Sequence, residues 1–193
     1  MKLQPGMVAP DFQRADIFGM PIQLYDKEGG ITLLSFFRNA ACAICNLRVH
    51  QLIERYPAYQ QRGLRIIAVF ESPQQRILQY VGKQDAPFPI IADPQAELYT
   101  LYGVESSAAK VAVTMTMPKT HGVIEQAAAH GFPLTKEDGS NFDRMPADFL
   151  LSYDRRVIVA HYADYVMDHL PLARLEEKLW GFAEASAQIM VRA

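Results

Sequence analysis

The chain has 193 residues, of which 50% are hydrophobic and 21% charged, and its formal net charge is −2. This composition is typical of a globular domain with its own core, and it excludes disordered and collagen-like chains. Without an excess of Lys and Arg to neutralise phosphates, no nucleic-acid partner is expected. No apolar run approaches the ~20 residues that span a bilayer, and the N-terminus lacks a signal-peptide pattern. We therefore expect one cytoplasmic domain over residues 1–193, with no membrane contact.

Strands and helices are predicted to alternate through the first half of the chain. A short strand is expected at Ile22–Tyr25. The apolar segment Ile31–Phe37 predicts a buried central strand. Helical spacing begins at Cys42, and Pro57 is expected to kink or break that helix. Leu64–Phe70 predicts a second buried strand. This order favours a parallel core with right-handed crossovers.

Two further helices begin with the pattern of a capping residue followed by proline. Ser72 is predicted to cap a short helix that runs to about Gly82, and Asp93 to cap one that runs to Gly103. A short apolar strand is expected between them at Phe88–Ala92. These elements continue the alternating α/β order.

Residues 105–143 have a different pattern, with weakly amphipathic stretches and a polar loop, and we interpret them as an insertion. After it, Phe149–Tyr153 and Val157–Tyr162 are predicted to form two strands that are joined by a turn at Asp154–Arg155. An amphipathic terminal helix is then expected to pack on the sheet. Its apolar stripe contains Leu172, Leu175, Leu179, Phe182 and Ser186.

The most informative feature is a pair of cysteines, Cys42 and Cys45, which are the only two in the chain. They lie where a buried strand ends and a helix begins. The helix dipole and the unpaired N–H groups lower the pKa of a thiol at this position. We expect Cys42 to be the nucleophile and Cys45, one turn further, to resolve a mixed disulfide. Arg38 could add positive charge to the site.

Two other interpretations of the pair stay open at this stage. Cysteines in a helix are often small apolar core residues. With His50 they also form C-x2-C-x4-H, but a closed zinc site needs four ligands and no further pair follows. A CxxC after a buried strand favours redox chemistry. We therefore expect no metal and no cofactor.

Several motifs resemble the peroxiredoxin-like branch of the thioredoxin superfamily, the alkyl hydroperoxide reductase/thiol-specific antioxidant group. The opening GMVAPDF is similar to G-x-x-A-P-x-F, and LSFFRNAACAIC is similar to a strand with F-[FY]-R-G followed by W-C-P-x-C. The segments FPIIADP, YGV and MPADFLL are similar to F-P-x-x-x-D, Y-G-V and P-A-x-F-x-I. The likeness covers nearly the whole chain.

The resemblance implies a thioredoxin-like α/β fold with a central mixed sheet flanked by helices. It places Cys42 and Cys45 at the active-site turn and implies that Pro146 is a cis-proline facing them, with the 105–143 insertion before its strand. Met145 and Ala41 would help to shape the site. It also implies an antioxidant role in cell redox homeostasis, and a homodimer is possible on the same grounds.

The chain departs from true peroxiredoxins, whose motif is P-x-x-x-T-x-x-C. Arg38 stands at the position of the proline and Cys42 at that of the threonine. The usual arginine before the later strand is replaced by Pro146, with Arg144 two residues out of register. We therefore expect a thiol–disulfide oxidoreductase acting on disulfides and recycled by a thioredoxin- or glutathione-type thiol. The alternatives are a thiol peroxidase acting on hydroperoxides, and a non-enzymatic redox sensor or partner-binding protein.

A few other residues are weaker candidates for roles at the site. Asp148 could be a buried acid for Cys45, although strand alternation favours a solvent-facing side chain. Met115, Met117 and Met145 could line a groove over the disulfide, or fill the core. A histidine could assist a thiol, and the chain has His50, His121, His130, His161 and His169.

Overall fold

The structure is a computed structural model that describes residues 1–25 and 30–191, with side chains described up to residue 181. In these residues the central sheet has five strands in the order β5-β4-β3-β6-β7. Its strands are β3 (Ile31–Phe36), β4 (Leu64–Phe70), β5 (Ile90–Ala92), β6 (Ala147–Leu151) and β7 (Val157–Tyr162). β4 runs parallel to β3 and β5, whereas β6 is antiparallel to β3 and β7, so the predicted mixed α/β sheet is confirmed.

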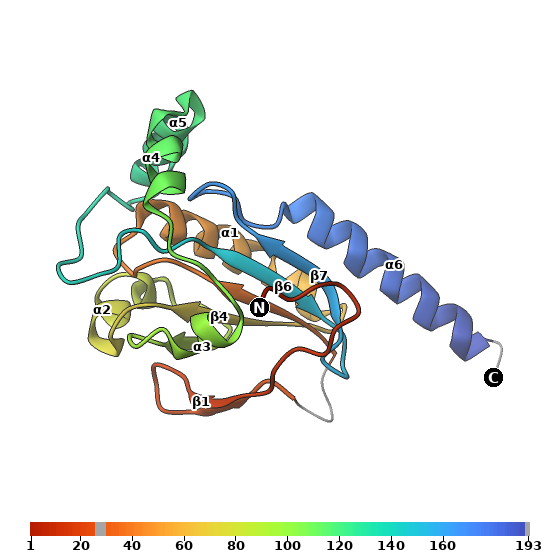
Figure 1. Cartoon of the computed structure of the whole chain (residues 1–193). Helices are drawn as coiled ribbons and strands as arrows, with labels where there is room; N and C mark the ends of the chain where they lie inside the picture. The colour runs from red at the N-terminus through yellow and green to blue at the C-terminus, as the bar shows by residue number, and fades with distance from the viewer. Residues whose placement is uncertain (26–29, 192–193) are drawn as a thin grey trace.

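Helices cover both faces of this sheet because both faces are apolar. Leu33 belongs to the apolar cluster on one face, whereas Leu34 and Phe36 belong to the cluster on the other. Figure 1 shows α1 (Ala43–Gln60) and α6 (Leu172–Val191) on one side of the sheet and α3 (Glu97–Leu101) on the other. The small antiparallel pair β1 (Gln13–Ala15) and β2 (Pro21–Gln23) lies on the α3 side.

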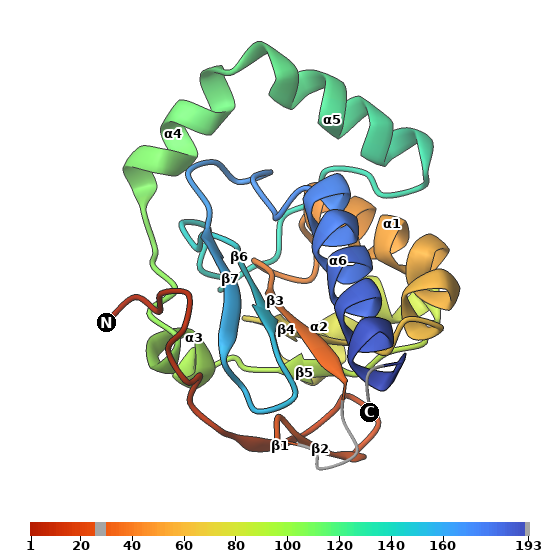
Figure 2. The ribbon, with the colours of Figure 1, turned by 90° about the vertical axis from the view of Figure 1, so that its right-hand side faces the viewer.

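The predicted insertion contains two helices. α4 (Ala108–Thr116) and α5 (Pro118–Ala129) form an arc beyond one end of the sheet (Figure 2). α5 packs against α1 through a small apolar cluster that contains Ala43, Leu47 and Ala127. A loop then returns to β6. Between β4 and β5 the chain forms α2 (Gln74–Gln79) and the 3-10 helix η1 (Val81–Gln84).

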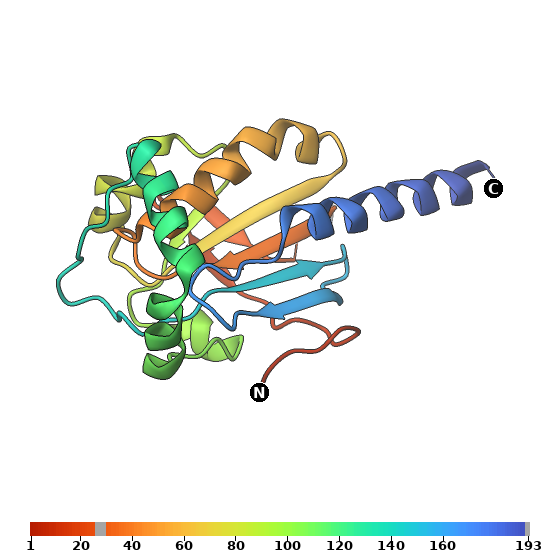
Figure 3. The ribbon, with the colours of Figure 1, turned by 90° about the horizontal axis from the view of Figure 1, so that it is seen from above.

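The terminal helix α6 packs on the sheet with its first half only. Leu175 and Leu179 are buried in the cluster beneath α1. The C-terminal half of α6 projects past the sheet (Figure 3). The side chains of Phe182 and Ser186, which the predicted stripe includes, lie outside the described residues. None of the described helices is both long and apolar enough to cross a membrane.

Two predictions about proline and capping were wrong. Pro57 does not break α1, because proline removes only its own N–H donor and the helix ends three residues later at Gln60. Ser72 does not cap α2: that helix begins at Gln74, and its cap residue is Pro73. The Ser72 hydroxyl instead accepts from Ala40 N–H at 2.9 Å.

The expected cis bond before Pro146 was also wrong, since that peptide bond is trans. Trans is the lower-energy form of an X–Pro bond, and here it suits the local backbone. Met145 N–H donates to Glu105 O at 3.0 Å, and Pro146 O accepts from Ala163 N–H at 3.2 Å. These bonds hold the segment extended as it enters β6.

Candidate active site

Cys42 lies at the N-terminus of α1, just past the end of β3. It is the N-cap residue of the helix, and its sulfur accepts a hydrogen bond from Cys45 N–H at 3.4 Å. Both thiols are free, with 7% of Cys42 and 1% of Cys45 exposed. The strand-to-helix position and the greater exposure of Cys42 agree with the sequence prediction.

The environment of Cys42 stabilises its thiolate. The hydrogen bond from the Cys45 side chain lowers the pKa of Cys42 most, and burial opposes this. The positive charge of Arg38 lowers the pKa further, to about 6. The Arg38 guanidinium contacts the sulfur directly, with Nη1 and Sγ 3.8 Å apart. At neutral pH Cys42 is therefore mostly a thiolate.

The environment of Cys45 instead favours its protonated thiol. Burial raises the pKa of Cys45 well above its ordinary value, and the neighbouring Cys42 thiolate raises it further. Cys45 therefore stays protonated and donates to Cys42 while the pair is reduced. One reactive thiolate and one protected thiol form an asymmetric couple.

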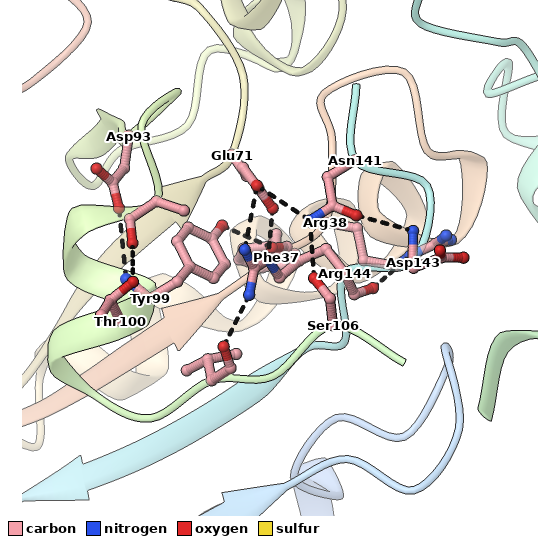
Figure 4. Close-up of polar contacts among 12 residues, drawn as sticks. Phe37, Arg38, Glu71, Asp93, Tyr99, Thr100, Ser106, Asn141, Asp143 and Arg144 are labelled. Atoms are coloured by element: carbon pink, nitrogen blue, oxygen red, sulfur yellow. Dashed lines mark hydrogen bonds and ion pairs between the residues drawn. The ribbon is translucent and has the colours of Figure 1, made fainter. Parts of the chain in front are cut away.

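Contacts on three sides hold Arg38 in place. It is 3% exposed, and its Nε donates to Arg144 O at 2.9 Å. Its Nη2 donates to Phe142 O, and the Phe142 ring lies 5.1 Å from the guanidinium carbon. Figure 4 draws Arg38 next to Arg144, whose backbone carbonyl accepts the hydrogen bond from Nε. The cation beside Cys42 is thus fixed before any substrate arrives.

Arg144 is engaged elsewhere and contacts neither sulfur. Its guanidinium forms a two-point ion pair with Glu71, in which Nη2 donates to Oε1 at 3.1 Å. Nη1 donates to Val104 O at 2.7 Å, and the guanidinium stacks on the Tyr99 ring at 4.7 Å (Figure 4). Arg144 therefore supports Arg38 through its backbone carbonyl only.

The loop that follows α5 is pinned to the active-site turn, which sequence reasoning missed. Ala41 N–H donates to the buried Glu137 carboxylate at 3.3 Å, and the Ser72 hydroxyl donates to the same oxygen at 3.0 Å. The Thr135 hydroxyl donates to Ala41 O at 3.2 Å. Since these residues are distant in sequence, no local pattern links them. The loop thus holds both backbone groups of the residue that precedes Cys42.

A pocket of about 320 Å³ opens beside this turn. Ala41 and Asn46 line it on the α1 side, Tyr80 and Lys83 on the η1 side, and loop residues such as Phe132 complete it. Ala41 directly precedes Cys42, although neither cysteine is among the residues that line the pocket.

The remaining candidate residues differ in their burial and in what they contact. Met145 is 1% exposed and belongs to the same apolar cluster as both cysteines, whereas Met115 is 38% exposed. The His50 ring lies 4.9 Å from that of His130 and does not contact a sulfur. In the described part of the chain, no group of three or more His, Cys, Asp or Glu side chains could hold a metal ion.

The prediction that Asp148 faces solvent was wrong, because both faces of the sheet are covered. Asp148 is fully buried and accepts from the Ser35 hydroxyl at 2.5 Å and from Leu170 N–H at 2.6 Å. His169 Nδ1 lies 3.0 Å from Asp148 Oδ2. Burial alone would raise the pKa of Asp148, but His169, Arg48 and Ser35 together hold it well below its ordinary value. No contact joins this network to Cys45.

Comparison with known proteins relates the chain to thiol-based redox proteins. Residues 5–129 match the AhpC/TSA family. The thiol-disulfide oxidoreductase ResA from Bacillus thuringiensis subsp. konkukian (strain 97-27) is 31% identical over 104 residues. That match covers 53% of this chain and 60% of ResA, less than two thirds of the relative's length.

Solved structures share the fold at low identity. The peroxidoxin BcpB from Mycobacterium tuberculosis superposes with a TM-score of 0.65 at 15% identity, covering 95% of this chain and 97% of BcpB. A thiol peroxidase from Chromobacterium violaceum gives 0.63 at 12% identity, covering 94% of this chain and 88% of that protein. At this identity the likeness establishes the thioredoxin-like fold alone.

Proposed function

The chain belongs to the AhpC/TSA family, and we propose that it is a thiol–disulfide oxidoreductase that works through the Cys42–Cys45 couple. The observation that carries the proposal is the asymmetry of the pair. Cys42 has a pKa lowered to about 6 at a helix N-terminus, whereas Cys45 is more buried and has a raised pKa. The relationship to ResA supports the same activity.

In the first step the Cys42 thiolate attacks one sulfur of a substrate disulfide. A Cys42–substrate disulfide forms, the substrate S–S bond breaks, and the other substrate sulfur leaves as a thiolate that takes up a proton. The fixed Arg38 guanidinium, 3.8 Å from Sγ, keeps the attacking sulfur charged. The pocket beside Ala41 is the approach for this substrate in the proposal.

In the second step Cys45 loses its proton and attacks the Cys42 sulfur. The Cys42 thiolate no longer exists in the mixed disulfide, so its contribution to the raised pKa of Cys45 disappears. The substrate leaves as its second thiol, and a Cys42–Cys45 disulfide remains. An external dithiol or two thiols of the thioredoxin or glutathione type then reduce this disulfide. We place the cycle in the cytoplasm, as the sequence predicts.

The site geometry favours disulfide exchange over peroxide reduction. Position 42, a threonine in the peroxiredoxin pattern, is here the low-pKa thiol itself. Arg144 is held by Glu71 and Val104 and is not directed at a sulfur. Of the arginines near the turn, Arg38 alone contacts Cys42 among the described residues. Peroxidase activity is therefore the second candidate, supported by family membership.

Trapping variants test the order of attack. We expect the reduced Cys45→Ser protein to form a stable mixed disulfide at Cys42 with 2-hydroxyethyl disulfide, because the resolving thiol is absent. The Cys42→Ser protein should form at least tenfold less adduct, since its remaining thiol is buried and protonated. Intact-mass spectrometry and peptide mapping measure both. Preferred labelling of Cys45 in Cys42→Ser would overturn the proposed roles.

A further inference from the structure

A second pocket lies between α1, α5 and residues 167–172, on a face of α1 that the dithiol chemistry does not use. It has a volume of about 380 Å³. We call it the α1–α5 pocket. Ile44 and Arg48 contribute from α1, Lys119 and Val123 from α5, and His169 from the segment before α6. None of these side chains has a role in the proposed thiol exchange.

Two buried side chains in its wall each have an unpartnered nitrogen. Arg48 is 8% exposed and His169 is 7% exposed. Arg48 Nη2 donates to Leu170 O at 2.6 Å, and His169 Nδ1 lies 3.0 Å from Asp148 Oδ2. Among the described residues, neither Arg48 Nε nor His169 Nε2 has a hydrogen-bond partner. Both nitrogens are themselves shielded from solvent, so a molecule in the pocket would meet the charge of the Arg48 guanidinium rather than bond to these two atoms.

The charged side chains of the pocket favour an anionic ligand. The charged side chains in its described wall are Arg48 and Lys119, and none of the described lining residues is acidic. The nearby Asp148 carboxylate is already occupied by Ser35, His169 and the Leu170 N–H. A cation would find no carboxylate ligand here, whereas a carboxylate would meet two positive charges.

Apart from Gln51 and Gln126, the rest of the wall is apolar and favours a hydrocarbon group. Ile44, Leu47 and Val123 line one part of the pocket, and Met167 and Leu172 line another. A bare inorganic anion would leave these surfaces uncovered. A ligand with an acidic end and a short apolar body matches both parts of the wall.

We propose that the α1–α5 pocket binds a small organic acid. The carboxylate is held by the positive charge of the Arg48 guanidinium, whose Nη2 is fixed on Leu170 O. Lys119, at the exposed rim, adds positive charge. The hydrocarbon part packs against Ile44, Val123 and Leu172.

Titration with hexanoate, monitored by calorimetry and by backbone amide NMR signals, tests this site in the reduced 193-residue protein. We expect saturable binding that shifts the signals of Val123 and His169. Hexan-1-ol has the same chain without the charge and should bind at least tenfold more weakly. Absence of saturable hexanoate binding, or equal affinity for hexan-1-ol, would overturn the proposal.

Variants separate this pocket from nonspecific binding. Arg48→Gln should weaken hexanoate binding at least tenfold. Val123→Phe should do the same by filling the pocket without touching the Arg48 and His169 contacts, which keeps the test decisive if Arg48→Gln does not fold. The control is Arg55→Gln, on an exposed part of α1 outside the pocket, which should bind like wild type. Unchanged binding in folded Val123→Phe would contradict the assignment.

Discussion

The reactivity of Cys42 depends on two neighbours with different contributions. The Cys45 side chain donates a hydrogen bond to the Cys42 sulfur and has the larger effect on its pKa, and Arg38 contributes its charge at 3.8 Å. Arg38 is in turn held by the backbone carbonyls of Phe142 and Arg144. The thiolate is therefore stabilised by groups that do not need to rearrange when it reacts.

Removing either neighbour should raise the pKa of Cys42. Alkylation by iodoacetamide follows the thiolate, so the wild-type rate should rise with pH through a midpoint of about 6 and then level off. Cys45→Ala should move this midpoint up most, and Arg38→Gln should move it up less. At pH 6 both variants should react several-fold more slowly. The pH–rate profile measures this, and unchanged midpoints in both variants would contradict the assigned causes.

Among the helices, α3 links the apolar cluster on its own face of the sheet to β3, the strand that precedes Cys42. The single Tyr99 hydroxyl hydrogen is shared between Phe37 O at 2.6 Å and Val69 O at 3.0 Å, at the ends of β3 and β4. The start of α3 is held by Asp93, whose carboxylate accepts from the N–H groups of Glu97, Leu98 and Tyr99. The N-cap position itself is Ala96, not Asp93 as predicted, and the Ala96 side chain makes no capping bond, so Asp93 binds the first N–H groups of this five-residue helix from outside it.

Loss of this cap should destabilise the protein measurably. Asp93→Ala leaves several N–H groups without an acceptor, one of them on the buried Leu98, and should lower the free energy of unfolding by about 1–2 kcal/mol. Asp93→Asn keeps one acceptor oxygen and should cost less. Urea unfolding followed by circular dichroism provides the comparison. The capping role would be refuted by an alanine variant as stable as wild type.

For the molecule as a whole, the loop after α5 brings a distant part of the chain onto the dithiol. Glu137 binds Ala41 N–H and Ser72, and Thr135 binds Ala41 O. Of these residues, Ala41 and Thr135 also line the pocket beside the turn, whereas Glu137 and Ser72 do not. The loop therefore fixes the residue that precedes Cys42 and supplies part of the pocket beside it.

Loosening this loop should expose Cys42. Glu137→Ala removes the acceptor for Ala41 N–H, so we expect limited proteolysis within residues 130–142 to become several-fold faster. Alkylation of Cys42 above pH 8, where it is fully ionised, should also become faster. Asp138→Ala changes an exposed acidic neighbour and serves as the matched control. Equal rates in both variants would show that Glu137 does not hold the loop closed.

The local features of this fold were predictable, whereas several tertiary ones were not. The strand before Cys42, the helix after it and the asymmetry of the thiols follow from periodicity and helix electrostatics over a short segment. The buried position of Asp148 was missed because its strand is covered on both faces, so alternation gives no solvent side. The contacts of Ser72 and Glu137 join segments 65 residues apart, which no local pattern encodes.

The most direct test compares two oxidants on the fully reduced wild-type protein at pH 7. Stopped-flow traces would follow its reaction with hydrogen peroxide and with 2-hydroxyethyl disulfide, and free thiols would be counted at the end. We expect 2-hydroxyethyl disulfide to oxidise both thiols, and hydrogen peroxide to be consumed no faster than by a free thiol. Fast peroxide consumption with loss of both thiols would contradict it and would identify a peroxidase.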